Sequence, residues 1–215
     1  MKKKIFLSIL LTSLLVIGVI FKISDSTSDN TLSSKELRTM YPAVHLQTQF
    51  VNTQDLSVDR MTDISKLIVT GTLVSMPEDI IIHQALGKNS TERYLANKNA
   101  EKEIDSVDFK FKRVKLKIDK TFKGESGKSI INITVPKISA DIFNNVKLGD
   151  KYLFMLVPAP NIGDNNWDTI DQLSYYISQS DQIVPFCDDS KFKDFIGMKV
   201  SKFKEYIESR NKDSK

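Results

Sequence analysis

The sequence predicts a mainly β protein with minor α content, built as a small barrel with one helix near its C-terminal end. Three observations support this prediction. Short runs of β-branched and aromatic residues alternate with turn residues from about residue 65 onward, the first run carries a glycine in its middle, and the final apolar stretch has helical spacing. Several short strands followed by one helix favour a closed or half-closed barrel.

The sequence begins with a segment that is expected to target the chain to a membrane. Lysines at positions 2–4 precede an uncharged apolar run over residues 5–21, which Lys22 closes. By the positive-inside rule these lysines stay in the cytoplasm, so the rest of the chain is expected outside. The run is intermediate in length between a signal peptide and a spanning helix, and residues 1–22 are therefore a signal-anchor or a signal peptide. The expected location is the cell membrane, with a single pass and an extracellular C-terminal domain, or the secreted state if the segment is cleaved.

Residues 23–60 are predicted to form a stalk or linker with one short helix. The stretch over residues 24–34 is polar and nearly free of apolar side chains, and the apolar residues that follow are irregularly spaced. The folded domain is therefore expected over residues 61–215. Inside it, residues 77–105 form a long polar insertion between the first two strands, partly helical around residues 91–104.

The first two predicted strands carry the irregularities expected of a barrel. The strand over residues 66–75 has Gly71 in its interior, which indicates a bulge or a tight bend. In the strand over residues 109–122 the apolar alternation changes phase across Lys112 and Arg113. A change of phase with the period kept predicts a β-bulge at that point.

The remaining elements follow in chain order. Turn residues at 123–128 connect the second strand to a third over residues 129–135, which together form a hairpin. An almost continuous apolar run predicts a strand buried on both faces, and two shorter strands can pair with each other through residues 179–181. These three stretches span residues 151–157, 174–178 and 182–186.

A helix is predicted over residues 201–210. Val200, Phe203 and Ile207 recur at the spacing of one helix face, after a glycine at position 197. Ser201 is the predicted N-cap of this helix.

Three blocks of this pattern resemble a known family. They are SKLIVTGTL at residues 65–73, VKLKIDKTFKG at residues 114–124 and LGDKYLF at residues 148–154. They look like successive blocks of the netrin-like domains related to tissue inhibitors of metalloproteinases, which also occur in exported bacterial proteins of unknown role. The resemblance implies a small five-stranded OB-like barrel. The inhibitors act through an N-terminal cysteine that reaches a catalytic zinc, and disulfides brace them; this chain has neither, so the inhibitory mechanism does not carry over.

Charge and cysteine content weigh against several classes of function. The chain has 31 basic and 27 acidic residues, a formal net charge of +4, and the lysines at positions 2–4 and 22 account for all of it. The rest of the chain is neutral, so nucleic acid is not an expected partner. The one cysteine, Cys187, excludes an intramolecular disulfide and is expected to be a small buried hydrophobe.

One short motif resembles a nucleotide-binding loop. The sequence GESGKS at residues 124–129 matches the end of a P-loop, but Phe122 stands where the motif needs its first glycine. A strand is also predicted after it, where a P-loop continues into a helix. The segment is therefore predicted to be a hairpin turn, and no nucleotide is expected to bind.

No metal, cofactor or catalytic group is predicted. Asp164, Asn166 and Asp168 match the first ligands of a calcium loop, but the glycine and the final glutamate of that motif are missing, so a solvated loop is the better prediction. The two histidines, His45 and His83, have no second histidine at ligand spacing.

Three aromatic residues are the candidates for ligand contact. Trp167, Tyr175 and Tyr176 lie in or beside a polar stretch, and such residues are common at binding surfaces. If both tyrosines lie on a strand they point to opposite faces, so at most one of them faces solvent.

The leading functional hypothesis is a membrane-tethered or secreted bacterial domain that is not an enzyme and binds a protein or a cell-envelope ligand. The export segment, the barrel pattern and the lack of a catalytic motif motivate it. One alternative is an exported hydrolase whose carboxylates are scattered over loops. The other is a protease inhibitor that acts through the insertion at residues 77–105.

Overall fold

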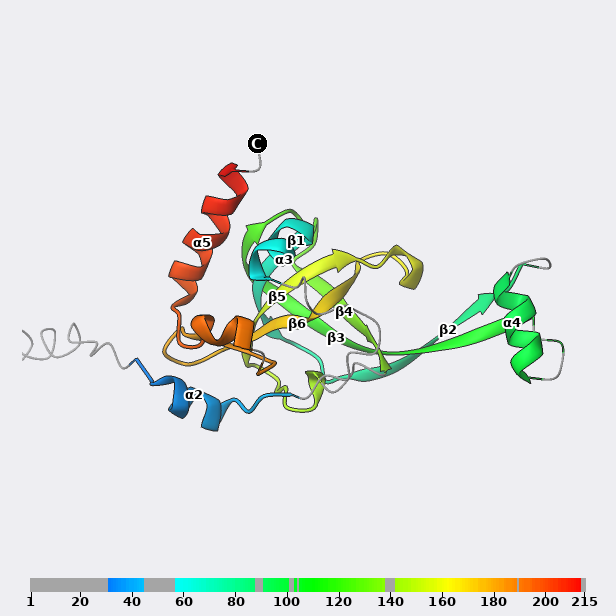
Figure 1. Cartoon of the computed structure of the whole chain (residues 1–215), viewed down its shortest axis with the longest axis horizontal. Helices are drawn as coiled ribbons and strands as arrows, with labels where there is room; N and C mark the ends of the chain where they lie inside the picture. Colours follow the sequence, from blue (N-terminus) through cyan, green and yellow to red (C-terminus); the bar gives the residue numbers. More distant parts are fainter. Residues whose placement is uncertain are drawn as a thin grey trace, which may run out of the picture. The chain divides into compact units, whose positions relative to one another are not determined.

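A computed structural model of the chain describes residues 31–44, 57–87, 91–100, 103, 105–137, 142–188 and 190–213 (Figure 1). The described residues from Ser33 onward belong to one compact unit. The predicted membrane segment at residues 1–22, most of the polar stalk and His45 lie outside the described residues. Within the described ranges, no helix is both long enough and apolar enough to span a membrane.

The described elements follow the predicted order, with one additional helix and one additional strand in the first half of the chain. They are α2 (Ser34–Met40), α3 (Val58–Ile64), β1 (Leu67–Leu73), β2 (Glu78–Ala85), α4 (Thr91–Ala100), β3 (Ser106–Lys123), β4 (Ile130–Pro136), β5 (Lys151–Pro158), η3 (Pro160–Ile162), β6 (Asn166–Ile177), β7 (Ile183–Pro185), η4 (Ser190–Phe195) and α5 (Val200–Asp213).

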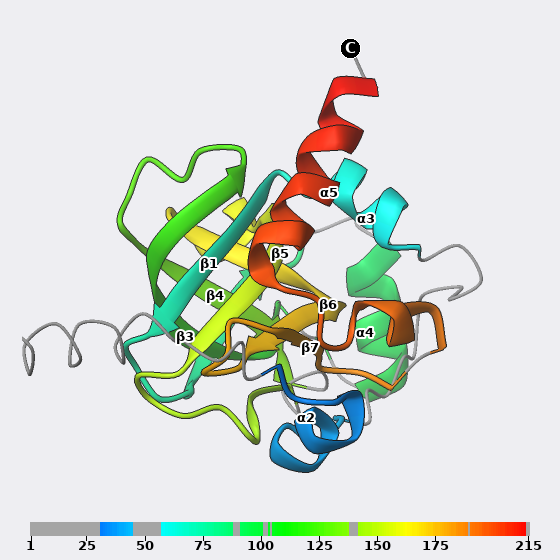
Figure 2. The ribbon, with the colours of Figure 1, turned by 90° about the vertical axis from the view of Figure 1, so that its left-hand side faces the viewer.

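Five strands close into a barrel, which confirms the predicted OB-like fold class (Figure 2). Around the barrel the order is β1, β3, β4, β6, β5 and back to β1. The β4–β6 pair is parallel and the other four pairs are antiparallel. Because β1 pairs with β3 on one side and with β5 on the other, the barrel has no open seam. The short strand β7 adds to β6 outside this ring.

Strand β5 is the centre of the core, and its predicted burial on both faces is confirmed. Its five residues from Tyr152 to Leu156 are all fully buried. Leu153 and Met155 face an outer layer that also contains residues of α3 and α5. Tyr152 and Phe154 point to the opposite face, because side chains alternate along a strand.

The helices α3 and α5 pack together over this outer face. Val58 and Met61 of α3 share a buried cluster with Phe203 and Ile207 of α5. At its exposed side, Asp59 of α3 accepts a hydrogen bond from the hydroxyl group of Tyr206 and pairs with Arg210. The helix just before the barrel is thus fastened to the last helix of the chain.

The start of α5 differs from the prediction by one residue. The helix begins at Val200, so Ser201 lies inside its first turn and is not the N-cap. The reason lies just before the helix, where Lys199 pairs with Gln182 in an isolated bridge and the Val200 amide donates to the Asp181 carbonyl. These backbone contacts hold the chain beside β7 up to residue 199.

The predicted β-bulge at Lys112 and Arg113 is wrong. Over residues 111–117, β3 pairs with β4 without any shift of register. The irregularities of β3 lie opposite β1, where Asp119 and Phe122 are the extra residues. The second of the two shifts falls between Thr70 and Gly71 of β1, which confirms the predicted irregularity at this glycine.

The insertion at residues 77–105 contains an unpredicted strand. Strand β2 pairs with the first half of β3 from Glu78 opposite Arg113 to Ala85 opposite Ser106, and α4 connects the two strands at the far end. We call β2, α4 and residues 106–110 the arm (Figure 1). The arm explains the change of phase in the apolar pattern that suggested a bulge. Phe109 faces Ile82 across the arm and therefore lies outside the barrel. Helix α4 ends at residue 100, short of the predicted 104.

Residues 33–44 are part of the folded unit, although the sequence places them in a linker. A capping box starts α2, in which the Ser33 hydroxyl accepts from the Glu36 amide and the Glu36 carboxylate accepts from the Ser33 amide. Leu37 is fully buried. Arg38 donates to the carbonyls of Pro185, at 2.6 Å, and Cys187, at 2.7 Å, which ties α2 to the end of β7.

Candidate functional site

Two surface cavities involve residues near the two ends of β6, and each includes one of the aromatic residues predicted to contact a ligand. Tyr176, near the C-terminal end of the strand, lines a cavity of about 400 Å³. Trp167, near the N-terminal end, lines a smaller cavity of about 240 Å³. We treat the larger cavity as the candidate site and call it the tyrosine pocket.

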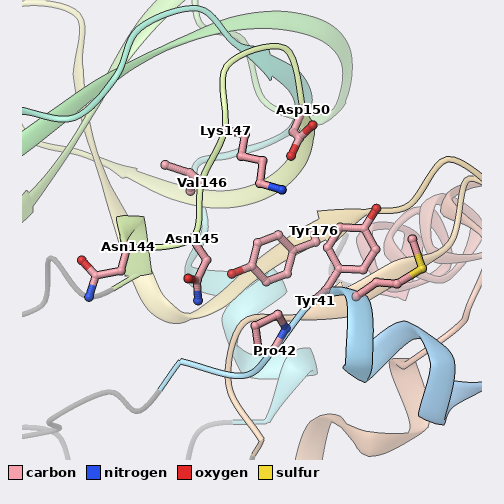
Figure 3. A pocket seen from close by; sticks show the side chains of 9 residues that line it. Tyr41, Pro42, Asn144, Asn145, Val146, Lys147, Asp150 and Tyr176 are labelled. Atoms are coloured by element: carbon pink, nitrogen blue, oxygen red, sulfur yellow. The ribbon is translucent and has the colours of Figure 1, made fainter.

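The tyrosine pocket is built from three separate parts of the chain (Figure 3). The end of α2 and the two residues after it form one side, the loop between β4 and β5 forms the other, and β6 supplies the floor. The lining residues are Met40, Tyr41, Pro42, Asn144, Asn145, Val146, Lys147, Asp150 and Tyr176.

The floor of the pocket is a fixed group of aromatic rings. The ring centroid of Tyr176 lies 5.3 Å from that of Tyr41, 4.3 Å from that of Phe186 and 5.9 Å from that of Tyr152. Tyr152 and Phe186 are fully buried, and Tyr176 is only 3% exposed. Such contacts hold each ring in place, so a ligand would meet a surface that is formed before it arrives.

The rim of the pocket is polar and exposed. Asn144, Asn145, Lys147 and Asp150 project from the β4–β5 loop, while Val146 is buried beneath it. The loop is attached to the floor because the backbone amide of Lys147 donates to the hydroxyl oxygen of Tyr152 at 3.0 Å. The rim therefore offers amide donors and acceptors, one cation and one anion, beside an aromatic floor.

The phenols of the pocket stay protonated at neutral pH. Burial raises the pKa of Tyr41, and the nearby Asp150 carboxylate raises it further. Burial also raises the pKa of Tyr176, which Asn145 and the Arg38 guanidinium partly oppose. The Tyr176 hydroxyl points toward Asn145 in Figure 3, without a well-formed hydrogen bond.

The smaller cavity lies between the β3–β4 turn and the β5–β6 loop. Its lining includes Lys128 from the first and Asp164 from the second, with Trp167 half-buried in its wall. The segment that resembles a P-loop forms this turn, with positive φ angles at Gly124 and Gly127, so the predicted hairpin is confirmed.

The segment that resembles a calcium loop is used to close the barrel. Residues 166–168 pair with β4 as a strand, so the prediction of a solvated loop is wrong for them. The side-chain amide of Asn166 donates to the carbonyls of Ile162, Gly163 and Asp164 at 3.0–3.3 Å, and its oxygen accepts from Thr134. These bonds fold the preceding turn. Among the described residues, no group of three or more His, Cys, Asp or Glu side chains is placed to hold a metal ion.

The three aromatic candidates do not form one surface. Tyr175 is fully buried against Phe203, with ring centroids 5.3 Å apart, and belongs to the core. Tyr176 and Trp167 line different cavities. Cys187 is buried, as expected. Tyr41 and the rim residues of the β4–β5 loop are not among the predicted residues, because nothing in the sequence indicates that the supposed linker returns to the barrel.

Comparison of the chain with models of protein families gave no match, and comparison with curated protein sequences gave none either. The resemblance to netrin-like domains therefore stays a prediction.

Proposed function

We propose that this chain is a membrane-tethered or secreted, non-enzymatic binding domain whose tyrosine pocket receives a ligand from the cell envelope. The observation that carries the proposal is the combination of a rigid aromatic floor with a polar, exposed rim. A volume of about 400 Å³ suits a small ligand or one short segment of a polymer. Loops at the ends of OB barrels are used elsewhere to bind oligosaccharides.

The rim chemistry favours a ligand with both hydrogen-bonding and charged groups. Asn144 and Asn145 can donate to and accept from hydroxyl or amide groups. Lys147 suits a carboxylate and Asp150 suits an ammonium or hydroxyl group. A peptidoglycan fragment, which joins sugars to a short peptide with charged ends, presents all of these groups.

The same geometry supports binding over hydrolysis. Hydrolysis of a sugar or peptide bond commonly needs a pair of acid–base groups or a metal. Of the described residues, Asp150 is the one carboxylate that lines the tyrosine pocket, and Asp164 is the one that lines the smaller cavity.

The test is titration of the full chain, in detergent and labelled with ¹³C at the methionine methyl groups, with soluble disaccharide-peptides released from peptidoglycan. Met40 lines the pocket and is 55% exposed, whereas Met76 lies outside it and is 54% exposed. We expect the Met40 resonance to shift saturably while the Met76 resonance stays fixed. Separate titrations with the disaccharide and with the peptide identify which part is bound.

Two lysine variants provide a matched control. Lys147→Ala removes the cation of the tyrosine pocket and should weaken binding about tenfold or more, whereas Lys128→Ala removes a lysine of the smaller cavity and should leave the affinity unchanged. The proposal fails if the Met40 resonance does not move at saturating fragment, or if both variants weaken binding equally.

A further inference from the structure

The arm exposes an unusually regular strand edge. Strand β2 pairs with β3 along one side, and nothing among the described residues pairs with its other side. Its sequence, EDIIIHQA, contains no proline, glycine or lysine, and its register with β3 has no shift. Natural edge strands are usually protected by proline, by lysine and other charged residues, or by bulges. In β2 the acidic residues, Glu78 and Asp79, stand at one end, so the edge that begins at Ile80 is a template for another strand.

The hydrogen-bonding pattern shows which residues face outward. The Leu86 amide donates to the Asp105 carbonyl at 2.8 Å, so this pair is hydrogen-bonded across the arm. Hydrogen-bonded pairs alternate in an antiparallel ladder, so Ile80 and Ile82 exchange bonds with β3. The backbone groups of Asp79, Ile81 and His83 therefore point away from β3, toward the open edge.

We propose that β2 pairs with β2 of a second copy of this chain, antiparallel, with the two-fold axis at Ile81. In this register Ile81 faces Ile81 of the second copy, and all the outward backbone groups of residues 79–83 find partners. An interface with two-fold symmetry must be self-complementary. The proposed pairing meets this requirement, because Asp79 of each copy stands opposite His83 of the other.

The charges beside this edge fit the same register. Asp79 lies 3.1 Å from Lys112, and the Nδ1 atom of His83 lies 2.6 Å from a carboxylate oxygen of Asp108. A carboxylate only accepts, so Nδ1 carries the hydrogen of that bond, and Nε2 is left to face the second copy. Pairing of the two edges places Lys112, Asp79, His83 and Asp108 in one row across four strands. When Nε2 also carries a hydrogen, His83 is a cation that can donate to Asp79 of the second copy, and opposite charges then alternate along the row, which stabilises this register.

The apolar side chains of the arm fit as well. Ile81 is 52% exposed and would become covered by its own copy. On the other face, Ile80 would meet Ile82 of the second copy, which extends the apolar face that Phe109 and Phe111 form on β3. This inference rests on the arm alone and is independent of the proposed ligand.

Cysteine cross-linking of the full chain tests the register. The Ile81→Cys variant places two thiols on the two-fold axis, where paired Cα atoms are about 5.5 Å apart and within the range of a disulfide. Gln84→Cys is the matched control, because the two Gln84 residues would be six positions out of register. Both variants keep the buried Cys187. We expect mild oxidation in the producing cells to give a reducible band at twice the 24.4 kDa of one chain for Ile81→Cys and not for Gln84→Cys.

A second variant separates edge pairing from association through any other part of the chain. Ile81→Pro removes an amide that points outward and leaves the ladder with β3 intact, so it should reduce the dimer fraction about tenfold or more with the thermal unfolding temperature nearly unchanged. Ile81→Val should leave the dimer in place. Three outcomes would each overturn the proposal. They are equal cross-linking at positions 81 and 84, cross-linking of position 81 only to a different protein, and a dimer that persists in Ile81→Pro.

Discussion

Replacement of Arg38 by alanine should release α2 from the barrel and open one side of the tyrosine pocket. The arginine side chain is 19% exposed and makes the two hydrogen bonds that join α2 to the last residue of β7 and to Cys187 just beyond it. Tyr41 and Met40, which line the pocket, follow it within one turn. The effect should therefore be local, because the barrel strands keep their own pairing.

The magnitude follows from the two hydrogen bonds and the ion pair that the substitution removes. A hydrogen bond from a charged donor contributes about 1.5–3 kcal/mol, and the exposed ion pair with Asp188, at 3.7 Å, adds less than about 1 kcal/mol. Water can satisfy the two carbonyls once α2 has moved, which favours the lower end of the sum, about 3 kcal/mol. A decrease of that size in the free energy of opening raises the population of the open form by about 100-fold.

Hydrogen exchange followed by mass spectrometry measures this opening directly. Peptides that cover residues 33–44 should exchange about 100-fold faster in Arg38→Ala, while peptides of β5 should be unchanged. Arg113→Ala is the control, because Arg113 makes an exposed ion pair with Glu78 on the arm and its removal should cost less than about 1 kcal/mol. Unchanged exchange at residues 33–44 would show that Leu37 and Tyr41 hold the segment alone, and the reasoning about Arg38 would be refuted.

Two further predictions concern the barrel. Gly71→Ala should destabilise the fold by about 3 kcal/mol, because the new Cβ atom would lie 2.5 Å from the Lys117 carbonyl oxygen, whereas Gly127→Ala, which meets no atom within 4 Å, should cost only the strain of its φ of +67°. Chemical unfolding of the two variants measures the difference, and equal costs would contradict the steric argument. Alkaline pH should also destabilise the protein, since burial raises the pKa of Tyr152 and of Tyr175 above that of a free phenol, about 10. The unfolded chain loses these protons first, so the free energy of unfolding should be constant below pH about 10 and fall above it, less steeply in Tyr152→Phe. Tyrosine absorbance near 295 nm that titrates fully while the fold stays intact would contradict this.

The barrel could be predicted from the sequence because its strands carry strong local signals. The run over residues 151–157 is apolar throughout because β5 is buried on both faces, and Gly71 marks the place where β1 approaches Leu116 too closely for a side chain. The hairpin turn at residues 124–129 was recognisable from its glycines and polar residues.

The parts that could not be predicted depend on contacts between distant residues. Strand β2 contains three consecutive isoleucines inside a polar insertion, and its pairing with β3 decides that it is a strand. Asn166 begins β6 among polar residues, and its strand conformation comes from the parallel pairing with β4. The tyrosine pocket could not be predicted either. One side of it depends on α2, which Arg38 holds against residues about 150 positions later in the chain.

The junction of α3 with α5 has a consequence for biosynthesis. The residues that cover the outer face of β5 come from both ends of the folded unit, and Asp59 meets its partners only when residues 206–210 are present. A chain that leaves the ribosome from its N-terminus therefore cannot complete this domain until nearly all of it has been made. Contacts so distant in sequence also slow folding. The domain should remain incompletely folded until residues 206–210 have been made, and an incompletely folded state is the one that a chain must have if it is to be threaded across a membrane.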